Sequence, residues 1–331
     1  MNQRRFTIAA LLFAFGVAAA SSGAFGQPAK FPNRPVRMIV PYAPGGATDI
    51  TARHLAARLI ELWGQQIVID NRAGASGNIA LELAARAAPD GYTLMVGNVS
   101  TNAINETTYV STLPFKPSQA LTGVTNLIEL PHLWVVSTAV PVSTIRQLID
   151  HVKKPGVRLN YATVGVGSYP HLDAVAFLKA AGIEMTHVPY KGGAGPIVPA
   201  LISNEVQFCL INMASSIQQV RAGRIKALTT TWPTRRPELP DVPTMTEAGF
   251  PGIGTNAWSG LFAPAKIPAP ILNRIHSDVV KTMEAPEMKE LLGKQFMSVV
   301  VNKSPAEFNQ FIQREVAKWG AIVRENNITI E

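Results

Sequence analysis

The chain has 331 residues, 47% of them hydrophobic, and carries 30 basic and 22 acidic residues for a net charge of +8. This length is enough for two domains with cores of their own. Lys and Arg are scattered rather than clustered, which argues against a nucleic-acid-binding protein and fits ordinary solubility. Cys209 is the single cysteine, so no intramolecular disulfide can form. It stands in the apolar run 206–211 and is predicted to be a buried core residue.

The first 26 residues are typical of a secretory signal peptide. Arg4 and Arg5 precede the apolar stretch 8–20, and small residues follow up to Gly26. We expect cleavage near Gly26/Gln27, with cleavage after Ala20 as a weaker alternative; twin-arginine export fits the surrounding residues poorly. Removal of this segment leaves 28 basic and 22 acidic residues, a net charge of +6, on a soluble, exported protein.

The loop 41–49, Pro-Tyr-Ala-Pro-Gly-Gly-Ala-Thr-Asp, joins an apolar run at 36–40 to an amphipathic segment at 50–63. Its two glycines permit a tight turn and a close approach of the backbone to a ligand. Thr48 or Asp49 is suited to cap the helix that follows. A strand, a glycine loop and a helix N-terminus with free N–H groups suit a small anion. An ordinary strand-to-helix turn explains the loop alone equally well.

Strands and helices alternate along most of the chain. In the first half, we predict a helix that ends at Gly64, a second glycine loop at 71–78, an Ala/Leu-rich helix to about Ala88, an Asp90-Gly91 turn, and strands at 67–69 and 92–96. This βαβαβ order predicts a largely parallel sheet with helices on its faces.

A second α/β unit begins near the strand 133–136, and its first helix begins around Ser143. Its glycine loops are 163–170 and 189–195, each placed after a strand. The remaining predicted elements of this unit are strands at 159–162, 185–188, 206–211 and 226–231 and a helix from His171 to Ala181 closed by Gly182. Ligands of open α/β sheets bind outside the carboxyl ends of strands, so two such lobes would form a closing cleft.

Helices are predicted to resume from Trp258 onward. The last one opens with a capping box, Ser304-Pro305-Ala306-Glu307, which has proline at the first helical position.

Short motifs spread over almost the whole exported part of the chain resemble those of one family. They are Phe31-Pro32-Asn33-Arg34-Pro35-Val36, the run from Ile39 to Gly46, Asp49 with Ala52-Arg53, Asn71-Arg72-Ala73-Gly74-Ala75, the run from Ala88 to Leu94, His171-Leu172, the run from His187 to Gly192, Ala222-Gly223-Arg224, and Asp241-Val242-Pro243-Thr244 with Glu247-Ala248-Gly249. By these residues the chain resembles the Bug (TctC-like) family, the periplasmic solute-binding proteins of tripartite tricarboxylate transporters.

The resemblance implies an α/β protein of the type II periplasmic-binding-protein fold, with two α/β domains, a hinge and a ligand cleft. One domain would comprise residues 27–128 and 257–331, after the signal peptide 1–26, and the other residues 129–256. Family members typically hold a carboxylate between backbone amides of the first strand–helix loop and a loop of the second domain. Such backbone sites need no fixed arginine.

Carried onto this sequence, the resemblance implies ligand contacts from loops of both domains and from the polar run 98–101. The implied residues are Tyr42, Ala43, Pro44, Gly45, Gly46, Thr48, Asp49, Ser100, Thr101, Gly165, Gly167, Ser168, Tyr169, His171, Tyr190, Lys191, Ile211 and Asn212.

Two positions depart from the family pattern and bear on the ligand. Ile211 stands where the family usually has an acidic residue, and Tyr169-Pro170 replaces small polar residues. If Ile211 and Tyr169 face the cleft, the site loses an acceptor for an ammonium group and gains apolar surface. We hypothesise a carboxylate with an apolar or aromatic body rather than an amino acid, which calorimetric titration against both classes tests. The alternative is that both side chains face away from the cleft.

The sequence allows two alternative roles for several single residues. Lys191 either lies near the anion or is a solvated loop lysine, and His171 either reaches the cleft or caps its turn. Tyr42, Tyr190 and Trp258 either shape the ligand wall or pack in an interface. Asp49, in the first helical turn, is expected to order the loop rather than to contact a carboxylate, and His187 is expected to be structural.

Catalytic and metal motifs are missing or weak. The segment 165–168 is not a G-x-S-x-G elbow, no P-loop is present, and the six histidines lack zinc spacing. We therefore expect no enzyme, cofactor or metal. The expected function is capture of a small carboxylate by a periplasmic monomer, without nucleic-acid partners, for delivery to the integral-membrane permease subunits of a tripartite tricarboxylate transporter. An exported hydrolase of a carboxylated substrate and a ligand sensor for a signalling partner remain as alternatives.

Overall fold

A computed structural model describes residues 31–190, 194–326 and 328 of the chain. The predicted signal peptide and its cleavage site lie outside these residues, and so does Lys191. Residues 34–331 form one unit that contains both sheets. Within the described part, no helix has the length and apolar character needed to cross a membrane.

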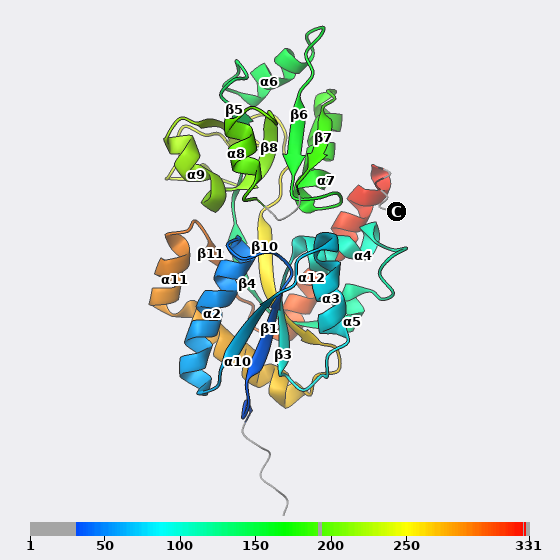
Figure 1. Ribbon diagram of the computed structural model, residues 1–331, viewed down its shortest axis with the longest axis vertical. Helices are drawn as coiled ribbons and strands as arrows, with labels where there is room; N and C mark the ends of the chain where they lie inside the picture. Colours follow the sequence, from blue (N-terminus) through cyan, green and yellow to red (C-terminus); the bar gives the residue numbers. More distant parts are fainter. Residues whose placement is uncertain (1–30, 191–193, 327, 329–331) are drawn as a thin grey trace, which may run out of the picture. The chain divides into compact units, whose positions relative to one another are not determined.

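The first sheet has six strands in the order β11-β4-β10-β3-β1-β2 (Figure 1). Their bounds are β1 (Val36–Val40), β2 (Ile67–Asn71), β3 (Thr93–Asn98), β4 (Leu121–Leu130), β10 (Ala257–Pro264) and β11 (Ser298–Val299). Strand β1 pairs in parallel with β2 and β3, whereas β10 pairs antiparallel with β3 and β4. The three strands of the predicted βαβαβ unit are parallel as expected, but the antiparallel pairs of β10 and β4, which that prediction did not include, make the whole sheet mixed.

Helices cover the first sheet on both faces. Their bounds are α2 (Ala47–Trp63), α3 (Asn78–Ala85), α4 (Asn105–Thr108), α5 (Pro117–Ala120), α10 (Ala269–Glu284), α11 (Pro286–Gly293) and α12 (Pro305–Glu325), with a short 3₁₀ turn at Ala75–Gly77 and a π turn at Ser100–Ile104. Helix α2 ends at Gly64, which is left-handed with φ 64°. Helix α12 begins as predicted, because the Ser304 side chain accepts a hydrogen bond from the Glu307 amide and Pro305 is the first helical residue.

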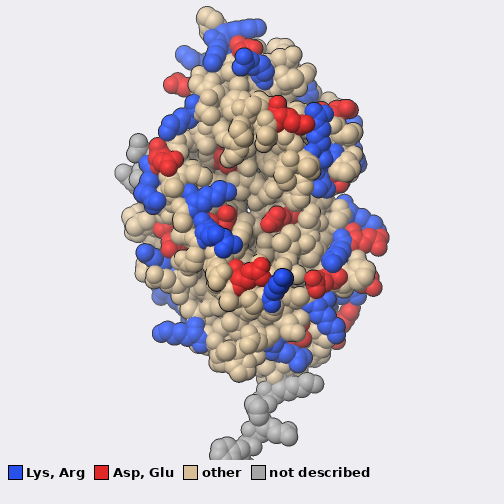
Figure 2. Space-filling view, turned by 180° about the vertical axis from the view of Figure 1, so that it is seen from behind, with Lys and Arg blue, Asp and Glu red and all other residues tan. Residues whose placement is uncertain are grey.

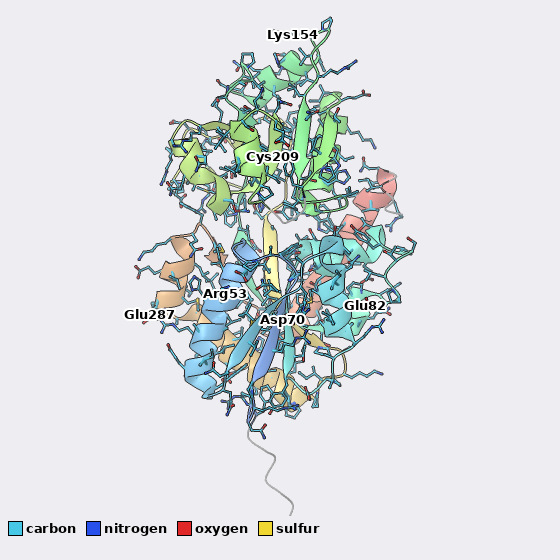
Figure 3. All side chains as sticks on the ribbon, in the orientation of Figure 1. Arg53, Asp70, Glu82, Lys154, Cys209 and Glu287 are labelled. Carbon is cyan, nitrogen blue, oxygen red and sulfur yellow. The ribbon has the colours of Figure 1, made fainter. Side chains whose placement is uncertain are left out.

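The second sheet has five strands in the order β7-β6-β8-β5-β9. Its elements are β5 (His132–Ser137), α6 (Ile145–Val152), β6 (Asn160–Thr163), α7 (Tyr169–Ala181), β7 (Thr186–Pro189), α8 (Ile197–Ile202), β8 (Phe208–Asn212), α9 (Met213–Arg221) and β9 (Ile225–Thr230). Strand β6 is parallel to β7 and β8, and β5 is antiparallel to β8 and β9. Cys209 lies in β8, 1% exposed, in agreement with the predicted core position (Figure 3).

Two segments join the sheets, which we call the crossovers. The first is the Leu130-Pro131-His132 step from β4 to β5, and the second runs from Gly254 into Ala257, where β10 begins. The prediction that helices resume from Trp258 was wrong, because Trp258 lies inside β10. Every residue of β10 is buried, so the strand shows none of the alternation that marks a half-exposed strand.

Basic and acidic side chains are interspersed on the face that Figure 2 shows. This agrees with the scattered charge of the sequence and gives that face no single-sign field.

Candidate functional site

A cavity of about 390 Å³ lies between segments that leave the two sheets. Five of the segments around it follow the carboxyl ends of β1, β3, β6, β7 and β8. The remaining wall comes from Leu130 and the start of β10, which belong to the two crossovers. Its volume falls in the range of sites for small molecules.

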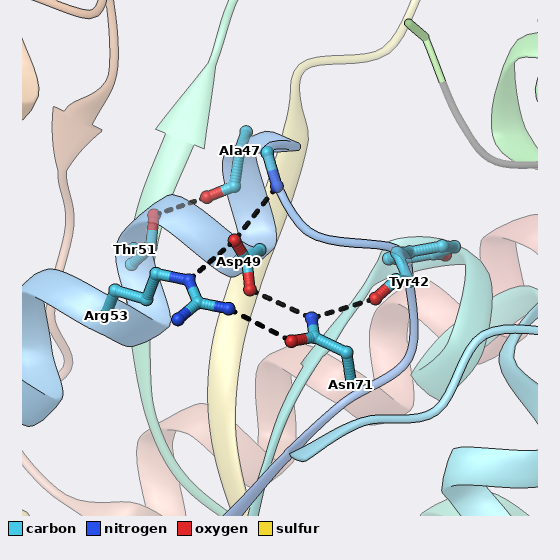
Figure 4. Close-up of polar contacts among 7 residues, drawn as sticks. Tyr42, Ala47, Asp49, Thr51, Arg53 and Asn71 are labelled. Atoms are coloured by element: carbon cyan, nitrogen blue, oxygen red, sulfur yellow. Dashed lines mark hydrogen bonds and ion pairs between the residues drawn. The ribbon is translucent and has the colours of Figure 1, made fainter. Parts of the chain in front are cut away.

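The loop after β1 is ordered by Asp49 (Figure 4). The Asp49 carboxylate accepts hydrogen bonds from the Gly45 amide, Arg53 Nε and Asn71 Nδ2, each at 2.9 Å. Asn71 Nδ2 also donates to the Tyr42 carbonyl at 3.0 Å. Burial by itself would raise the pKa of Asp49, but these hydrogen bonds outweigh it and lower the pKa. Asp49 is 2% exposed and does not line the cavity, as its predicted ordering role requires.

The N-terminus of α2 lies at the cavity. The N-cap is Gly46, which has extended dihedral angles and no side-chain cap, so the predicted capping by Thr48 or Asp49 was wrong. The first backbone hydrogen bond of the helix runs from the Ile50 amide to the Gly46 carbonyl. The amides of Gly46, Ala47 and Thr48 have no acceptor among the described residues, and all three residues line the cavity. The helix dipole adds partial positive charge there.

Neutral polar side chains continue the wall beside α2. The Thr48 and Ser259 hydroxyls are 3.4 Å apart, and the Tyr42 hydroxyl lies 3.2 Å from Asn98 Oδ1. Burial raises the pKa of Tyr42 to about 12, so this phenol stays protonated at neutral pH. Ser100 Oγ accepts a hydrogen bond from the Tyr169 amide at 3.3 Å, which joins the N-terminus of α7 to this wall.

The second sheet contributes Tyr169 and the start of α9. Asn212 is the N-cap of α9, and its Oδ1 accepts the Ser215 amide at 2.8 Å. The Met213 amide donates to the Pro131 carbonyl at 3.0 Å. These amides of α9 are therefore already paired, in contrast to those of α2.

Apolar side chains complete the cavity. Leu130, Val164 and Ala257 line it. Trp258 also borders it, but its side chain is 2% exposed, packs on Phe308 and Phe311 of α12, and donates from Nε1 to Glu315 at 3.0 Å. Among the described residues that line it, none is Asp, Glu, Lys, Arg or His. An anion in this cavity would be held by backbone amides and neutral hydroxyls.

About half of the residues implied by the family resemblance lie on the cavity wall. They are Tyr42, Ala43, Pro44, Gly45, Gly46, Thr48, Ser100, Tyr169 and Asn212. Lys191 lies outside the described residues. The other implied residues do not line it: Asp49, Thr101, Gly165, Gly167, Ser168, His171, Tyr190 and Ile211.

Each of these side chains off the wall has another place. Ile211 is 2% exposed and packs in the core of the second sheet, so its side chain does not add apolar surface to the cavity. The Thr101 hydroxyl accepts a hydrogen bond from the Asn98 amide at 3.0 Å. The Ser168 hydroxyl donates to the Gly165 carbonyl at 2.6 Å, and the Tyr190 hydroxyl to Glu205 at 2.6 Å.

His171 turns inward onto its own loop. Its Nδ1 accepts the Gly167 amide at 3.2 Å, and its ring stacks on that of His187 with centroids 4.3 Å apart. Burial lowers the pKa of both imidazoles to about 4, and for His187 the neighbouring His171 adds to the effect. Both rings are neutral at neutral pH and hold the loop that precedes α7.

Ten residues on the wall are not in the set that the resemblance implies. They are Ala47, Asn98, Leu130, Val164, Ala194, Gly195, Ser215, Ala257, Trp258 and Ser259. Asn98 and Trp258 were candidates from their positions in the sequence. Ala47, Val164, Ala194 and Gly195 stand inside the predicted glycine loops, so their positions could have been inferred from the sequence. Leu130, Ala257 and Ser259 carry no such signal, because the strands β4 and β10 were not predicted.

A larger hollow of about 670 Å³ lies elsewhere on the first-sheet side, between residues 106–119 and α12. Glu106, Lys116 and Arg324 are among its lining residues. It receives nothing from the second sheet and no strand carboxyl end, so we place the candidate site in the smaller cavity.

Comparison with known proteins agrees with this architecture. The sequence model of TctC, described as tripartite tricarboxylate transporter family receptor, matches residues 51–328. Protein BugT of Bordetella pertussis is 30% identical over 91% of this chain and 92% of its own length. A structure of Rpa4515 from R. palustris with adipate superposes with a TM-score of 0.84 at 32% identity, covering 91% of this chain and all of that one.

A structure of MatC (Rpa3494) from Rhodopseudomonas palustris with bound malate gives a TM-score of 0.80 at 32% identity, over 88% of this chain and 100% of that one. The fold is thus that of two-domain α/β periplasmic binding proteins. With most of the chain matched by the family model, this protein belongs to the TctC family of tripartite tricarboxylate transporter receptors.

Proposed function

We propose that this receptor captures a small carboxylate in the 390 Å³ cavity, in the periplasm, and delivers it to the membrane subunits of a tripartite tricarboxylate transporter. The observation that carries the proposal is the set of amides of Gly46, Ala47 and Thr48, which have no acceptor among residues 31–190, 194–326 and 328. They lie on the wall of a cavity whose described lining has no charged side chain. Amides at a helix N-terminus are strong donors to a carboxylate.

The relatives support the class of ligand. Rpa4515 was solved with adipate and MatC with malate, both carboxylates. Tyr169 and Leu130 also lie on the cavity wall, which favours a ligand with an apolar segment. No acidic side chain is among the described lining residues, so an ammonium group would lack a partner there.

Closure of the cleft is the second part of the proposal. We assign residues 27–128 and 257–331 to one domain and residues 129–256 to the other, each closing on the ligand by rotation at the crossovers. The N-terminal 26 residues would direct export before cleavage near Gly26/Gln27. A monomer is sufficient, because both walls of the cavity come from one chain.

The family consists of receptors rather than enzymes. We extend this to the chain and propose that it releases its ligand unchanged. Mass spectrometry of the small molecule released on denaturation would identify that ligand, and recovery of a cleaved product after incubation with a carboxylate would favour a hydrolase instead. A sensor that passes the liganded form to a signalling partner would bind the same ligand but would not support its uptake.

Substitution of Ala47 tests the role of the amides. Ala47 is the first residue of α2, and Gly46 before it has φ −81° and ψ 165°, a conformation that a following proline accepts. Ala47→Pro therefore removes one N–H and keeps the helix. We expect adipate or malate affinity, measured by calorimetry, to fall roughly ten- to a hundredfold, the cost of a hydrogen bond to a charged group.

Ala47→Gly is the matched control, because it alters the side chain and retains the amide. It should leave the affinity within about threefold, since only a methyl group is lost. Equal affinities of the Ala47→Pro variant and the wild type, or no binding of any carboxylate in a panel of adipate, malate and benzoate, would contradict the proposal.

A further inference from the structure

The first crossover is fixed to the second sheet through His132. This residue is fully buried and starts β5. Its Nδ1 lies 3.2 Å from the Leu130 carbonyl, an acceptor, so Nδ1 carries the proton and Nε2 accepts a hydrogen bond from the Tyr169 hydroxyl. The His132 and Tyr169 rings meet edge to face with centroids 5.0 Å apart. Tyr169, at the first position of α7, is thereby held against the crossover.

The second crossover is tied to the first through the hydroxyl of Thr231. Thr231 Oγ1 accepts the His132 amide at 3.0 Å and donates to Asn256 Oδ1 at 3.1 Å. The Thr231 amide also donates to the His132 carbonyl at 2.9 Å. One hydroxyl therefore bridges the two crossovers.

The backbone of the second crossover also approaches Thr231 closely. At Gly254, φ is +96°, and a Cβ there would lie 2.8 Å from Thr231 Cγ2. Only glycine permits this packing.

Helix α7 also holds the second crossover. The Asp173 carboxylate accepts two hydrogen bonds from Thr255, at 2.9 Å from its amide and 3.1 Å from its hydroxyl. Tyr169 and Asp173 are four residues apart and lie on one face of α7. One face of α7 thus contacts both crossovers: Tyr169 contacts the first through His132, and Asp173 contacts the second through Thr255.

On the other side, the crossovers belong to the first sheet. Leu130 pairs directly with Ala257, the last pair between β4 and β10. The next residues are held differently, since the Pro131 carbonyl accepts the Met213 amide of α9 and Asn256 is bound by Thr231. The change of attachment therefore falls at Leu130 on one crossover, since Leu130 pairs with Ala257 while its carbonyl accepts from His132 Nδ1, and between Asn256 and Ala257 on the other.

We propose that His132, Tyr169, Asp173, Thr231, Thr255 and Asn256 form a hinge block that moves with the second sheet, so that bending is confined to the Leu130–Pro131 and Asn256–Ala257 joints. Tyr169 belongs both to this block and to the cavity wall, and Leu130 and Ala257 lie on the wall across the joints. A ligand in the cavity touches both sides of the bend. Closure driven by a ligand rests on the proposed function, whereas the hinge block itself does not. Thr231 is a positioning residue, because it does not line the cavity.

The test compares Thr231→Val with Thr231→Ser. Valine keeps the shape and loses the bridging hydroxyl, whereas serine keeps the hydroxyl. Spin labels at Lys154→Cys and Glu287→Cys would report distances between the two sheets (Figure 3). Both positions are exposed; Lys154 follows α6 beside the second sheet, and Glu287 lies in α11 beside the first. Cys209 is buried and does not compete for the labels.

In the ligand-free protein, Thr231→Val should broaden the interlabel distance distribution, and Thr231→Ser should restore the width of the wild type. With adipate as the probe, the valine variant should bind roughly two- to tenfold more weakly, the scale of one hydrogen bond, and the serine variant like the wild type. An unchanged distribution in the valine variant, or equal broadening in both variants, overturns the hinge block. Failure of the wild type to bind adipate or another carboxylate contradicts the proposed function, but the ligand-free distances still decide the hinge block.

Discussion

The carboxylate of Asp49 accepts a hydrogen bond from the backbone amide of Gly45 at 2.9 Å, four residues earlier in the chain. This contact folds the loop back onto the first turn of α2. The amides of Gly46, Ala47 and Thr48 follow, and they have no acceptor in the part of the chain that the structure describes.

Asp49→Ala should therefore destabilise the loop after β1. The substitution removes the acceptor of the Gly45 amide and of Arg53 Nε, and Asp49 is nearly fully buried. We expect a loss of about 1.5–3 kcal/mol in the free energy of unfolding, the scale of hydrogen bonds to a charged group. Urea unfolding measures it. Glu61→Ala, on the exposed face of α2, is the control and should change stability by less than about 0.5 kcal/mol.

Gly45 and Gly46 should respond differently to alanine. Gly45 has φ +97°, which an L-residue adopts at a cost, whereas Gly46 has φ −81°. A Cβ at either position would meet nothing within 4 Å, so the difference is one of backbone strain alone. Gly45→Ala should lower stability by about 1–2 kcal/mol and Gly46→Ala by much less. Thermal unfolding of both variants checks this; equal losses would show that strain at Gly45 is not the cause.

The stacked imidazoles of His171 and His187 should weaken the fold in mild acid. Burial lowers the pKa of each to about 4, below the unfolded value of 6.5. Between pH 6.5 and 4 the unfolded chain binds more protons, so stability falls as the pH falls through this window. His171→Asn keeps an acceptor for the Gly167 amide and cannot titrate. Its free energy of unfolding should depend less on pH than that of the wild type, and parallel pH profiles would refute the assignment.

Ionisation of Asp173 should change the stability with pH in the opposite direction to that of the two histidines. Burial raises its pKa to about 7, against hydrogen bonds from Thr255 and the charge of Lys318, which lower it. From pH 4 to 7 the folded protein holds a proton that the unfolded chain has lost, so this group reduces stability as the pH rises. Asp173→Asn preserves both contacts with Thr255, because the threonine hydroxyl can turn to accept. The stability of the variant relative to wild type should grow from pH 4 to pH 8, and a constant difference would contradict it.

Cys209 should be unreactive in the native protein. The thiol is 1% exposed in β8, and burial raises its pKa, so the thiolate is scarce at neutral pH. Maleimide labelling followed by mass spectrometry should show no adduct in buffer and complete labelling in urea. Rapid labelling of the folded chain would mean that β8 opens readily.

The local features of the fold were predictable where glycine or a cap determines the backbone. Gly64 and Gly182 end α2 and α7 in the left-handed conformation, and Ser304 caps α12. Strand β10 escaped prediction because it is buried on both faces and contains Gly260. Its glycine is needed since a Cβ there would lie 2.3 Å from the Phe308 ring. Gly260 and Phe308 are 48 positions apart, so their contact leaves no local pattern in the sequence from which the strand could be predicted.

The candidate site was predictable in its main-chain part and less so in its side chains. The loop 41–49 follows a strand and opens a helix, and both features are visible in the sequence. The face of the sheet on which a β8 side chain lies depends on the register of strand pairing. Ile211 pairs with Leu133 of β5, and both side chains pack in the same core. A shift of one residue would have reversed the inward and outward positions of Ile211 and Asn212.

The free amides of α2 have a consequence for how such receptors diverge. Among the standard residues only proline lacks a backbone N–H, so nearly every mutation at Gly46, Ala47 or Thr48 leaves the donors in place. Substitutions at Tyr169, Val164 or Leu130 change the shape of the cavity and leave these donors in place. Under the proposed function, duplicated genes could acquire new ligands by altering these side chains while the capture of the carboxylate is inherited intact.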